Sequence, residues 1–197
     1  MSETHIMRAL VTGGAGFIGS RLGISPIKKR HQVIALDDLN LGYVWYLVDF
    51  MGKDGFEFVK DDWRKKVDAR ITLGNVGIVF HLAARPDVRL CRGYPWNCFT
   101  ENVLATEVLL KATGSCGASK FVFTPSSTLC GDATVIPTPE DYSSLLPISP
   151  YGDAELASEA ILSGHSNSFG FDVLVLRLAN TVGEESMHGI VQTSSRS

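Results

Sequence analysis

The chain has 197 residues, of which 45% are apolar and 20% charged, so one domain with a sizeable core is expected. Its net charge of −3 comes with no basic stripe and with no apolar run near the ~18 residues of a membrane span, which argues against nucleic-acid and membrane partners. The four cysteines show no Cys-x-x-Cys or metal-ligand spacing, and the first residues lack a signal-peptide pattern. We therefore expect reduced, partly buried thiols in a cytoplasmic protein and no metal site.

The first predicted element is a short strand, Ala9–Val11, which leads into a glycine-rich turn and then into a helix. The glycines of this turn have separate roles. Gly13 permits the tight turn, Gly16 lets the backbone approach a pyrophosphate, and Gly19 lets the helix pack on the strand. A glycine triplet alone is weak evidence, and an ordinary glycine-rich turn is the alternative. The flanking strand and helix, and an acidic residue about 20 positions later, favour nucleotide binding.

The helix after this turn begins near Phe17 and Ile18, whose N–H groups would face an anion together with the positive end of the helix dipole. Gly23 and Pro26 lie in its expected interior. There, proline costs about 3 kcal/mol and glycine about 1 kcal/mol relative to alanine. We therefore expect the helix to stop or kink near Ile24.

The second predicted strand, Gln32–Leu36, ends at Asp37. A carboxylate at this place accepts hydrogen bonds from the hydroxyls of an adenosine ribose and repels a 2′-phosphate, so the sequence favours NAD over NADP. The alternative is that Asp37 only caps a loop. The spacing from the glycines makes that alternative the less favoured one.

Farther along, predicted strands and helices alternate. The strands are expected at Phe56–Val59, Gly77–Leu82, Phe121–Thr124 and Asp172–Leu178, and the helices at Asn102–Ala112 and Tyr151–Leu162. Loops are expected at Arg85–Phe99 and Tyr142–Pro150. This alternation predicts an α/β fold, a doubly wound parallel sheet covered on both faces.

The fourth predicted strand carries a histidine and ends in small residues. His81 sits inside the apolar run, and a core histidine with satisfied hydrogen bonds is a better interpretation than a ligand or a base. Ala83 and Ala84 follow Leu82, and such small residues let the backbone approach a cofactor.

Six stretches together resemble the extended short-chain dehydrogenase/reductase family, in particular its nucleotide-sugar epimerases and dehydratases. They are Thr12–Gly19, Leu36–Leu39 with the Asn-Leu-Gly after it, His81–Ala84, Thr124–Thr128, Pro147–Gly152 and Arg177–Asn180. The similarity runs almost from end to end and is greatest to UDP-glucose 4-epimerases of the archaeal type. It implies a Rossmann NAD-binding domain over residues 1–190, with a disordered tail over 191–197. It also implies bound NAD, a UDP-sugar substrate and a homodimer formed through the two helices predicted above.

The resemblance also implies the residues of the site. Tyr151 falls at the position of the family's base and Ser126 at that of its hydroxyl partner, while Ser126 and Asn180 fall at substrate-binding positions. The cofactor-binding positions are Gly13, Gly16, Phe17, Ile18, Gly19, Asp37, Asn40, Asp62, Trp63, Leu82, Ala83, Ala84, Asn102, Thr124, Tyr151 and Glu155. In the family, a tyrosinate takes the proton of a sugar hydroxyl while hydride leaves the carbon for the nicotinamide. An epimerase then returns the hydride to the other face of the sugar, so NAD is retained.

The residues after Ser126 distinguish the two reaction types of the family. Similar dehydratases carry an Asp-Glu pair there to remove water, whereas this chain has Ser127 and Thr128. Neither is an acid or base of suitable pKa, which favours epimerase chemistry over dehydration.

The chain departs from the family pattern at Glu155, where a lysine is expected four residues after Tyr151, on the same helix face. The lysine favours the phenolate, whereas an ionised carboxylate opposes it. The change moves the balance by about 5 kcal/mol, on the order of 4 pKa units. We therefore hypothesise that Tyr151 stays protonated at neutral pH and that turnover is severely slowed. A pH–rate profile with a tyrosine titrating near neutrality would contradict this.

The second departure is length, because family members usually continue well beyond the last residue here. That extra part supplies most of the sugar-nucleotide pocket, so the C-terminal substrate domain is expected to be largely missing. Two functions stay open. One is an epimerase that transiently oxidises the sugar at C4, and the other is a catalytically impaired NAD-binding module. A methyltransferase with a similar glycine turn fits the pairing of Tyr151 and Ser126 poorly.

Overall fold

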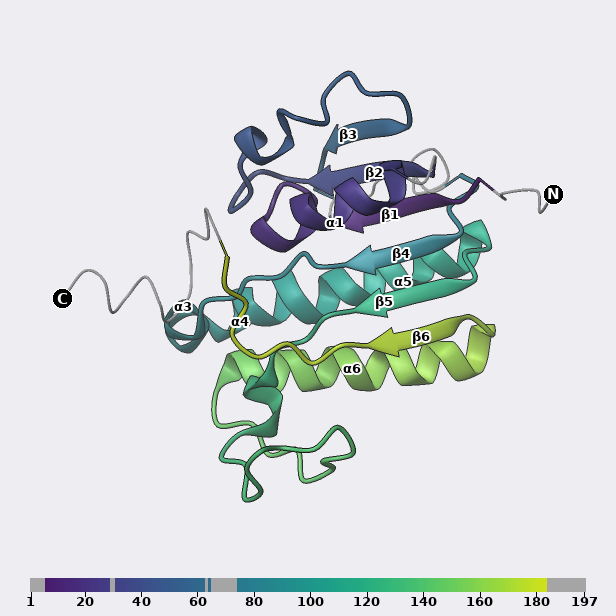
Figure 1. Cartoon of the computed structure of the whole chain (residues 1–197). Coiled ribbons are helices and arrows are strands. Elements are labelled where there is room, and N and C mark those ends of the chain that lie inside the picture. Colours follow the sequence, from purple (N-terminus) through teal and green to yellow (C-terminus); the bar gives the residue numbers. More distant parts are fainter. Residues whose placement is uncertain (1–5, 29–30, 63, 65–73, 184–197) are drawn as a thin grey trace.

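In the computed structural model, which describes residues 6–28, 31–62, 64 and 74–183, six parallel strands form one sheet. The strands are β1 (Arg8–Thr12), β2 (Gln32–Asp37), β3 (Phe56–Lys60), β4 (Ile78–His81), β5 (Lys120–Phe123) and β6 (Asp172–Val175). Their order is β3-β2-β1-β4-β5-β6, and every neighbouring pair is parallel (Figure 1). The strand order reverses between β1 and β4, the switch point at which such sheets hold dinucleotides.

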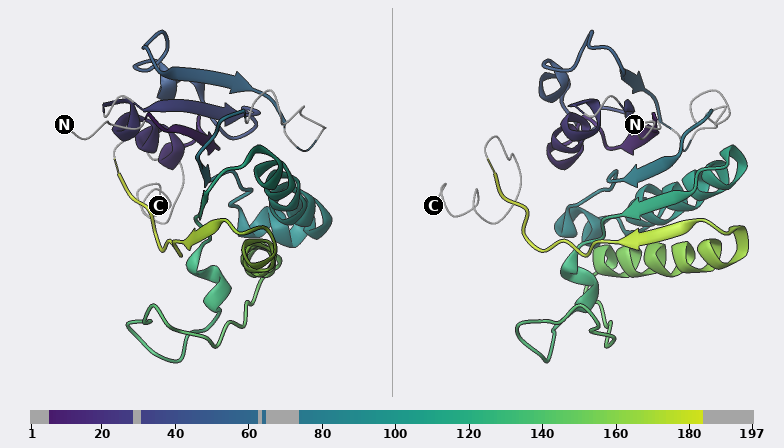
Figure 2. Two further views of the ribbon diagram at one scale, coloured as in Figure 1. Left: turned by 90° about the vertical axis from the view of Figure 1, so that its right-hand side faces the viewer. Right: turned by 45° about the vertical axis from the view of Figure 1, so that its right-hand side comes forward.

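Helices cover both faces of this sheet. They are α1 (Phe17–Lys28), α3 (Val88–Gly93), α4 (Pro95–Cys98), α5 (Ala105–Cys116) and α6 (Pro150–Phe169), with the π-helix η3 (Phe99–Leu104) and the 3₁₀ turns η1 (Val44–Leu47) and η4 (Ser127–Cys130). Figure 2 shows α1 on one face and α5 with α6 on the other. The prediction of a doubly wound parallel sheet is therefore correct.

The main core lies between the sheet and the pair α5–α6. Leu10 of β1, Phe121 of β5, Leu110 of α5 and Leu162 of α6 meet there, and none of them is exposed. Strands that are buried on both faces consist of near-continuous apolar runs. This pattern allowed the central strands to be predicted from the sequence.

His81 belongs to this core, as predicted. Its ring is 1% exposed and forms hydrogen bonds to the hydroxyls of Thr12 at 2.7 Å and Thr106 at 2.9 Å. Burial lowers the pKa of His81 to about 4, so the ring is neutral at pH 7.

The first helix continues to Lys28, so the expectation that it stops near Ile24 is wrong, while a kink there stays a prediction. Pro26 lies only two residues before the end of α1. A proline there removes one main-chain hydrogen bond, and the helix nevertheless continues through it.

The segment Arg85–Phe99 was expected to be a loop, but it contains α3 and α4. Asp87 caps α3, because its carboxylate accepts the N–H groups of Arg89 at 2.8 Å and Leu90 at 3.0 Å. Pro95 is the first residue of α4, where its missing N–H costs nothing. Asp87 and Pro95, residue types that are typical of loops, therefore mark the beginnings of two short helices here.

Cys91 and Cys98 form a disulfide, so the expectation of four reduced thiols is wrong for this pair. The chain reverses between α3 and α4 and brings their Cα atoms to 5.0 Å, which a disulfide can span. Their separation of seven residues matches no sequence motif that would have predicted the bond. Cys130 is free, and the side chain of Cys116 lies outside the described part of the structure.

The last strand is shorter than predicted, but its pairing continues beyond Val175. The N–H of Leu176 donates to the carbonyl of Phe123 at 2.8 Å, and Ser126 and Leu178 form a parallel bridge. The segment after β6 therefore runs beside the end of β5. The predicted tail, 191–197, lies outside the described residues, and among those described no helix is both long and apolar enough to cross a bilayer.

Candidate functional site

The glycine turn lies at the carboxyl end of β1, against the chain that leaves β4. Gly13 has φ of +67°, and a Cβ there would stand 2.8 Å from the backbone nitrogen of Ala83. The N–H of Gly16 donates to the carbonyl of Gly13 at 2.9 Å, which closes the turn. A Cβ on Gly19 would overlap the carbonyl oxygen of Gly13, so only glycine lets α1 start this close to the turn.

The start of α1 presents main-chain N–H groups at this edge. The first N–H groups of a helix, those of Phe17 and Ile18 here, have no acceptor inside the helix. The first turn of α1 carries no acidic side chain that would repel an anion. A Cβ added to Gly183 would stand 2.9 Å from the ring of Phe17, so the segment after β6 reaches the start of α1.

Asp37 ends β2 and is 6% exposed. Its carboxylate accepts the N–H of Ala15 at 3.0 Å and that of Leu39 at 2.8 Å, so it ties the glycine turn to the loop after β2. Burial raises the pKa of Asp37, and these two hydrogen bonds oppose the shift. A carboxylate has about four lone-pair sites, so capping this loop leaves acceptors for the hydroxyls of a ribose.

Next to Asp37, at the carboxyl ends of β2 and β3, lies a cavity of about 460 Å³. Its lining residues are Asp38, Asn40, Lys60, Asp61, Asp62, Arg64 and Thr100. Two predicted cofactor residues are therefore in its wall. The Asn40 amide donates to Asp38 at 2.8 Å, and the Asp62 carboxylate accepts from Arg64 at 2.6 Å. Trp63, predicted beside them, lies outside the described residues.

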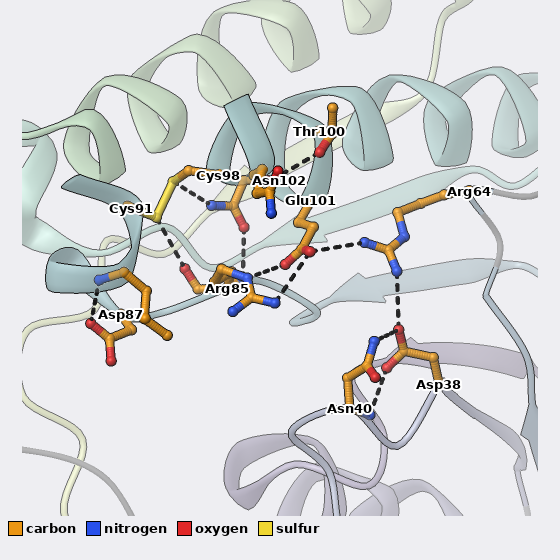
Figure 3. Close-up of polar contacts among 12 residues, drawn as sticks. Asp38, Asn40, Arg64, Arg85, Asp87, Cys91, Cys98, Thr100, Glu101 and Asn102 are labelled. Atoms are coloured by element: carbon orange, nitrogen blue, oxygen red, sulfur yellow. Dashed lines mark hydrogen bonds and ion pairs between the residues drawn. A yellow bond between two sulfur atoms is a disulfide. The ribbon is translucent and has the colours of Figure 1, made fainter. Parts of the chain in front are cut away.

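Arg64, which was not among the predicted site residues, joins the two sides of the switch point. Its guanidinium pairs with Asp38 at 3.2 Å and with Glu101 of η3 at 3.7 Å (Figure 3). Glu101 also pairs with Arg85. These ions form a chain from the end of β2 to the segment after β4. The signal that could have found it was an arginine two residues after Asp62.

The predicted cofactor residues after β4 and β5 are held by main-chain contacts. Leu82 N–H donates to the carbonyl of Thr12 at 3.2 Å, and Ala83 N–H donates to its hydroxyl at 3.4 Å. The hydroxyl of Thr124 donates to the carbonyl of His81 at 3.4 Å. These bonds set the ends of β1, β4 and β5 side by side.

Asn102 uses its amide inside the protein. It is 3% exposed, its oxygen accepts the N–H of Arg85 at 2.7 Å, and its nitrogen donates to the sulfur of Cys98 at 3.4 Å (Figure 3). Asn102 therefore fixes the chain just after Ala84 against η3 and the disulfide.

The structure brings Tyr151, Ser126 and Glu155 together at the carboxyl end of β5. Tyr151 lies in the first turn of α6, and its phenol is close enough to the side chain of Ser126 for Ser126 to affect its pKa. Glu155 follows one turn later, is 3% exposed, and accepts the N–H of Ser126 at 2.7 Å. Because neighbouring strands are about 4.8 Å apart, the ends of β1 and β5 are separated by about 10 Å. The pair thus lies at the same edge as the glycine turn.

The buried acid changes the protonation of this group. Burial raises the pKa of Tyr151, the charge of Glu155 raises it further, and the hydrogen bond with Ser126 opposes both. Burial also raises the pKa of Glu155 to about 7, against the effect of its hydrogen bond from Ser126. The raised pKa of Tyr151 has the direction that the hypothesis of a protonated Tyr151 requires. The raised pKa of Glu155 leaves its carboxyl only partly ionised near pH 7, which weakens its repulsion of the phenolate there.

The hydroxyl of Thr128 is a buried polar group in the turn after β5. Its oxygen is buried and has no hydrogen-bond partner within the described part of the chain. A buried hydroxyl left without a partner costs free energy, which an added polar group would recover. Asn180, predicted to contact the substrate, is exposed on the segment after β6.

The comparison with known proteins agrees with this geometry. The profile of the NAD dependent epimerase/dehydratase family matches residues 9–195. The chain belongs to this family.

Among its members, the chain is 37% identical to a UDP-glucose 4-epimerase of Mycolicibacterium smegmatis, over 93% of the chain and 59% of that protein. It is 33% identical to a putative UDP-glucose 4-epimerase of the archaeon Methanocaldococcus jannaschii, over 89% of the chain and 56% of that protein. A UDP-glucuronic acid 4-epimerase from Bacillus cereus, solved with UDP-glucuronic acid and NAD, is 29% identical with a TM-score of 0.79, over 87% of the chain and 56% of that structure. The chain thus spans less than two thirds of the length of these relatives.

The residues of this family member fit the NAD that the family uses. The glycine turn is a cradle that a Cβ would fill, and the start of α1 carries no acid. Along the same edge, the cavity beside Asp37 would take the adenosine, the turn the diphosphate, and the segment from Ala83 to Ser126 the nicotinamide. In this arrangement the subsites would follow the order of the strands, from β2 across β1 to β5.

Proposed function

We propose that the chain binds NAD across the carboxyl edge of its sheet and acts on a UDP-sugar, as a 4-epimerase that interconverts UDP-glucose and UDP-galactose. The contact between Tyr151 and Ser126, at the same edge as the glycine turn, is the observation that carries this proposal. The names of the similar proteins, most of them UDP-sugar 4-epimerases, supply the substrate class.

The roles of the residues follow from their chemistry. The phenol oxygen of Tyr151 would take the proton of the sugar 4-hydroxyl and later return it. The hydroxyl of Ser126 would hold the same sugar oxygen, and the orphaned hydroxyl of Thr128 would bind a neighbouring polar group. NAD, when bound, supplies the hydride acceptor for the sugar carbon. Tyr151 can act as a base only after losing its own proton, which Glu155 opposes.

The raised pKa of Tyr151 favours a second function, an NAD-binding module with little catalysis. Glu155 stands where a cation would favour the phenolate, and its carboxyl is tied to the backbone of Ser126. The two functions share the dinucleotide site and differ only in whether proton transfer at Tyr151 is fast enough for turnover.

One experiment separates these functions. The purified chain is examined for retained NAD by mass spectrometry and is then incubated with NAD and either UDP-glucose or UDP-galactose. Interconversion that Tyr151→Phe abolishes and Tyr142→Phe leaves intact supports the epimerase. Bound NAD without interconversion supports the module, and failure to bind NAD contradicts both.

Two copies are also expected to pair through α5 and α6. Within one chain these two helices lie side by side. Nε2 of His165 on α6 is 3.3 Å from a carboxylate oxygen of Glu107 on α5. Light scattering should give the mass of a dimer, and a monomer at all concentrations would contradict the pairing.

A further inference from the structure

Glu155 is an acid buried at the catalytic end of α6. Its side chain is 3% exposed, and its one described hydrogen bond is from the N–H of Ser126, at 2.7 Å. α6 begins at Pro150, capped by Ser149, and this start rests on the turn that follows β5. The carboxyl therefore lies at the edge of the sheet and not on the solvent face of the helix.

The groups around Glu155 leave its charge without a cation. From its own helix it faces the phenol of Tyr151, and from the turn after β5 it faces the backbone of Ser126. The elements packed on this part of α6 contribute an apolar cluster that includes the disulfide. Arg177, on the segment after β6, pairs with Glu159 instead. Within the described residues, no ion pair neutralises the Glu155 carboxyl.

The topology sets which part of a dinucleotide comes near this acid. If the adenosine lies beside Asp37 and the diphosphate at the glycine turn, the nicotinamide half extends over the ends of β4 and β5. Glu155 bonds to Ser126 at that end. This step depends on the proposed function, because it assumes that NAD occupies the edge.

We propose that Glu155 is a specificity-determining residue for the redox state of the dinucleotide, favouring oxidised NAD over reduced NADH. The oxidised nicotinamide ring carries a positive charge and the reduced ring carries none, while the rest of the molecule is unchanged. An uncompensated carboxylate held nearby and shielded from water therefore stabilises only the oxidised form. A lysine at this position would have the opposite preference.

The preference should depend on pH, since only the carboxylate attracts the ring. Burial raises the pKa of Glu155 to about 7, so the carboxyl gains its charge over the range in which both dinucleotides can be studied. The pKa of Tyr151 is raised, so its phenol adds no charge in that range.

Titration calorimetry with NAD and with NADH tests the inference without any turnover. The ratio of the two dissociation constants is measured for the wild-type chain, Glu155→Gln and Asp153→Asn at pH 6.0 and 8.5. At pH 8.5 we expect NAD to be favoured over NADH by about tenfold more in the wild type than in Glu155→Gln. The wild-type preference should shrink at pH 6.0. Asp153→Asn, which removes an exposed charge from the same helix turn, should behave as the wild type.

Equal ratios in the wild type and Glu155→Gln, with both dinucleotides bound, would overturn this inference and leave the proposed function standing. Binding of neither dinucleotide would overturn both. If Glu155→Gln does not fold, the pH dependence of the wild-type ratio decides alone, and a ratio that stays constant between pH 6.0 and 8.5 overturns the inference.

Discussion

The carboxyl of Glu155 accepts the backbone N–H of Ser126 at 2.7 Å, which fastens the first turns of α6 to the end of β5. The same contact holds both proposed catalytic residues, because Tyr151 lies one turn before Glu155. The Glu155 carboxyl therefore opposes ionisation of the Tyr151 phenol and also stabilises the packing of α6 on the end of β5. Stability and catalysis should respond in opposite ways when this residue is changed.

Glu155 should make the fold less stable as pH rises. Its pKa is raised from an ordinary value of 4.5 to about 7 by burial, so its stabilising contribution is complete below pH 4.5 and is lost as pH rises through 7. Relative to Glu155→Gln, the wild-type free energy of unfolding should fall by about 3 kcal/mol between pH 4.5 and pH 8. Urea denaturation of both chains across this range measures the difference. A constant difference would show that the carboxyl is not buried as described.

Replacing Glu155 with lysine should lower the pKa of Tyr151. The change turns repulsion of the phenolate into attraction, a shift on the order of 4 units. It also leaves the N–H of Ser126 without its acceptor, so a loss of about 1–3 kcal/mol of stability should accompany it. Phenolate absorbance against pH, with Glu155→Lys/Tyr151→Phe as the blank, gives the pKa. A pKa unchanged from the wild type would remove the electrostatic account of this site.

Much of the fold was readable because the strands are buried on both faces. The central residues of β1, β2 and β5 form apolar runs, and α5 and α6 keep helical periodicity, so the existence and order of these elements followed from the sequence. The continuation of α1 past Pro26 was not predicted, because an interior proline loses a main-chain hydrogen bond and crowds the preceding turn, and the sequence alone does not show that the fold tolerates this cost.

Residues of the candidate site could be predicted from the sequence where the residue type itself indicates the role, as a glycine does at a tight turn. Gly13 and Gly19 make the close backbone approaches expected of them, and Tyr151 and Ser126 lie together. Asp37 caps the loop after β2 and ties it to the glycine turn, and its contact with a ribose stays a prediction. The chain of ions through Arg64 and the disulfide were missed, because each joins residues whose partner is set by tertiary structure. A charged side chain in a loop does not indicate what it pairs with.

Gly19 should be the least replaceable glycine of the turn. A Cβ there would overlap the carbonyl oxygen of Gly13 and lie 2.9 Å from Cα of Gly14, and both are backbone atoms that cannot rotate away. Gly19→Ala should therefore lower stability by about 1–3 kcal/mol and weaken NAD binding at least tenfold.

Gly164 provides the matched control. It also lies in a helix, α6, but an added Cβ meets nothing within 4 Å. Gly164→Ala should raise the free energy of unfolding by about 0.5–1 kcal/mol and leave NAD binding unchanged. Urea denaturation and NAD titration of both variants make the comparison. Equal changes in unfolding free energy and in NAD affinity for the two alanine variants would contradict the close backbone approach at Gly19.

His81 should act on stability in the opposite direction to Glu155. Burial lowers its pKa from 6.5 to about 4, so its stabilising contribution is complete above pH 6.5 and is lost as pH falls through 4. Relative to His81→Gln, the wild-type free energy of unfolding should therefore rise by about 3 kcal/mol between pH 4 and pH 7. At pH 7, His81→Ala should cost about 2–4 kcal/mol, because the hydroxyls of Thr12 and Thr106 lose their partner and a cavity remains.

The two effects cover nearly the same pH range and have similar size, so they should largely cancel in the wild type. Urea denaturation between pH 4 and 8 should give a nearly flat profile from these two groups. In Glu155→Gln, stability should rise with pH, because only the histidine remains; in His81→Gln it should fall, because only the acid remains. If both single variants keep the wild-type profile, neither group is coupled to folding. A slope in only one variant would show which of the two pKa values departs from its ordinary range.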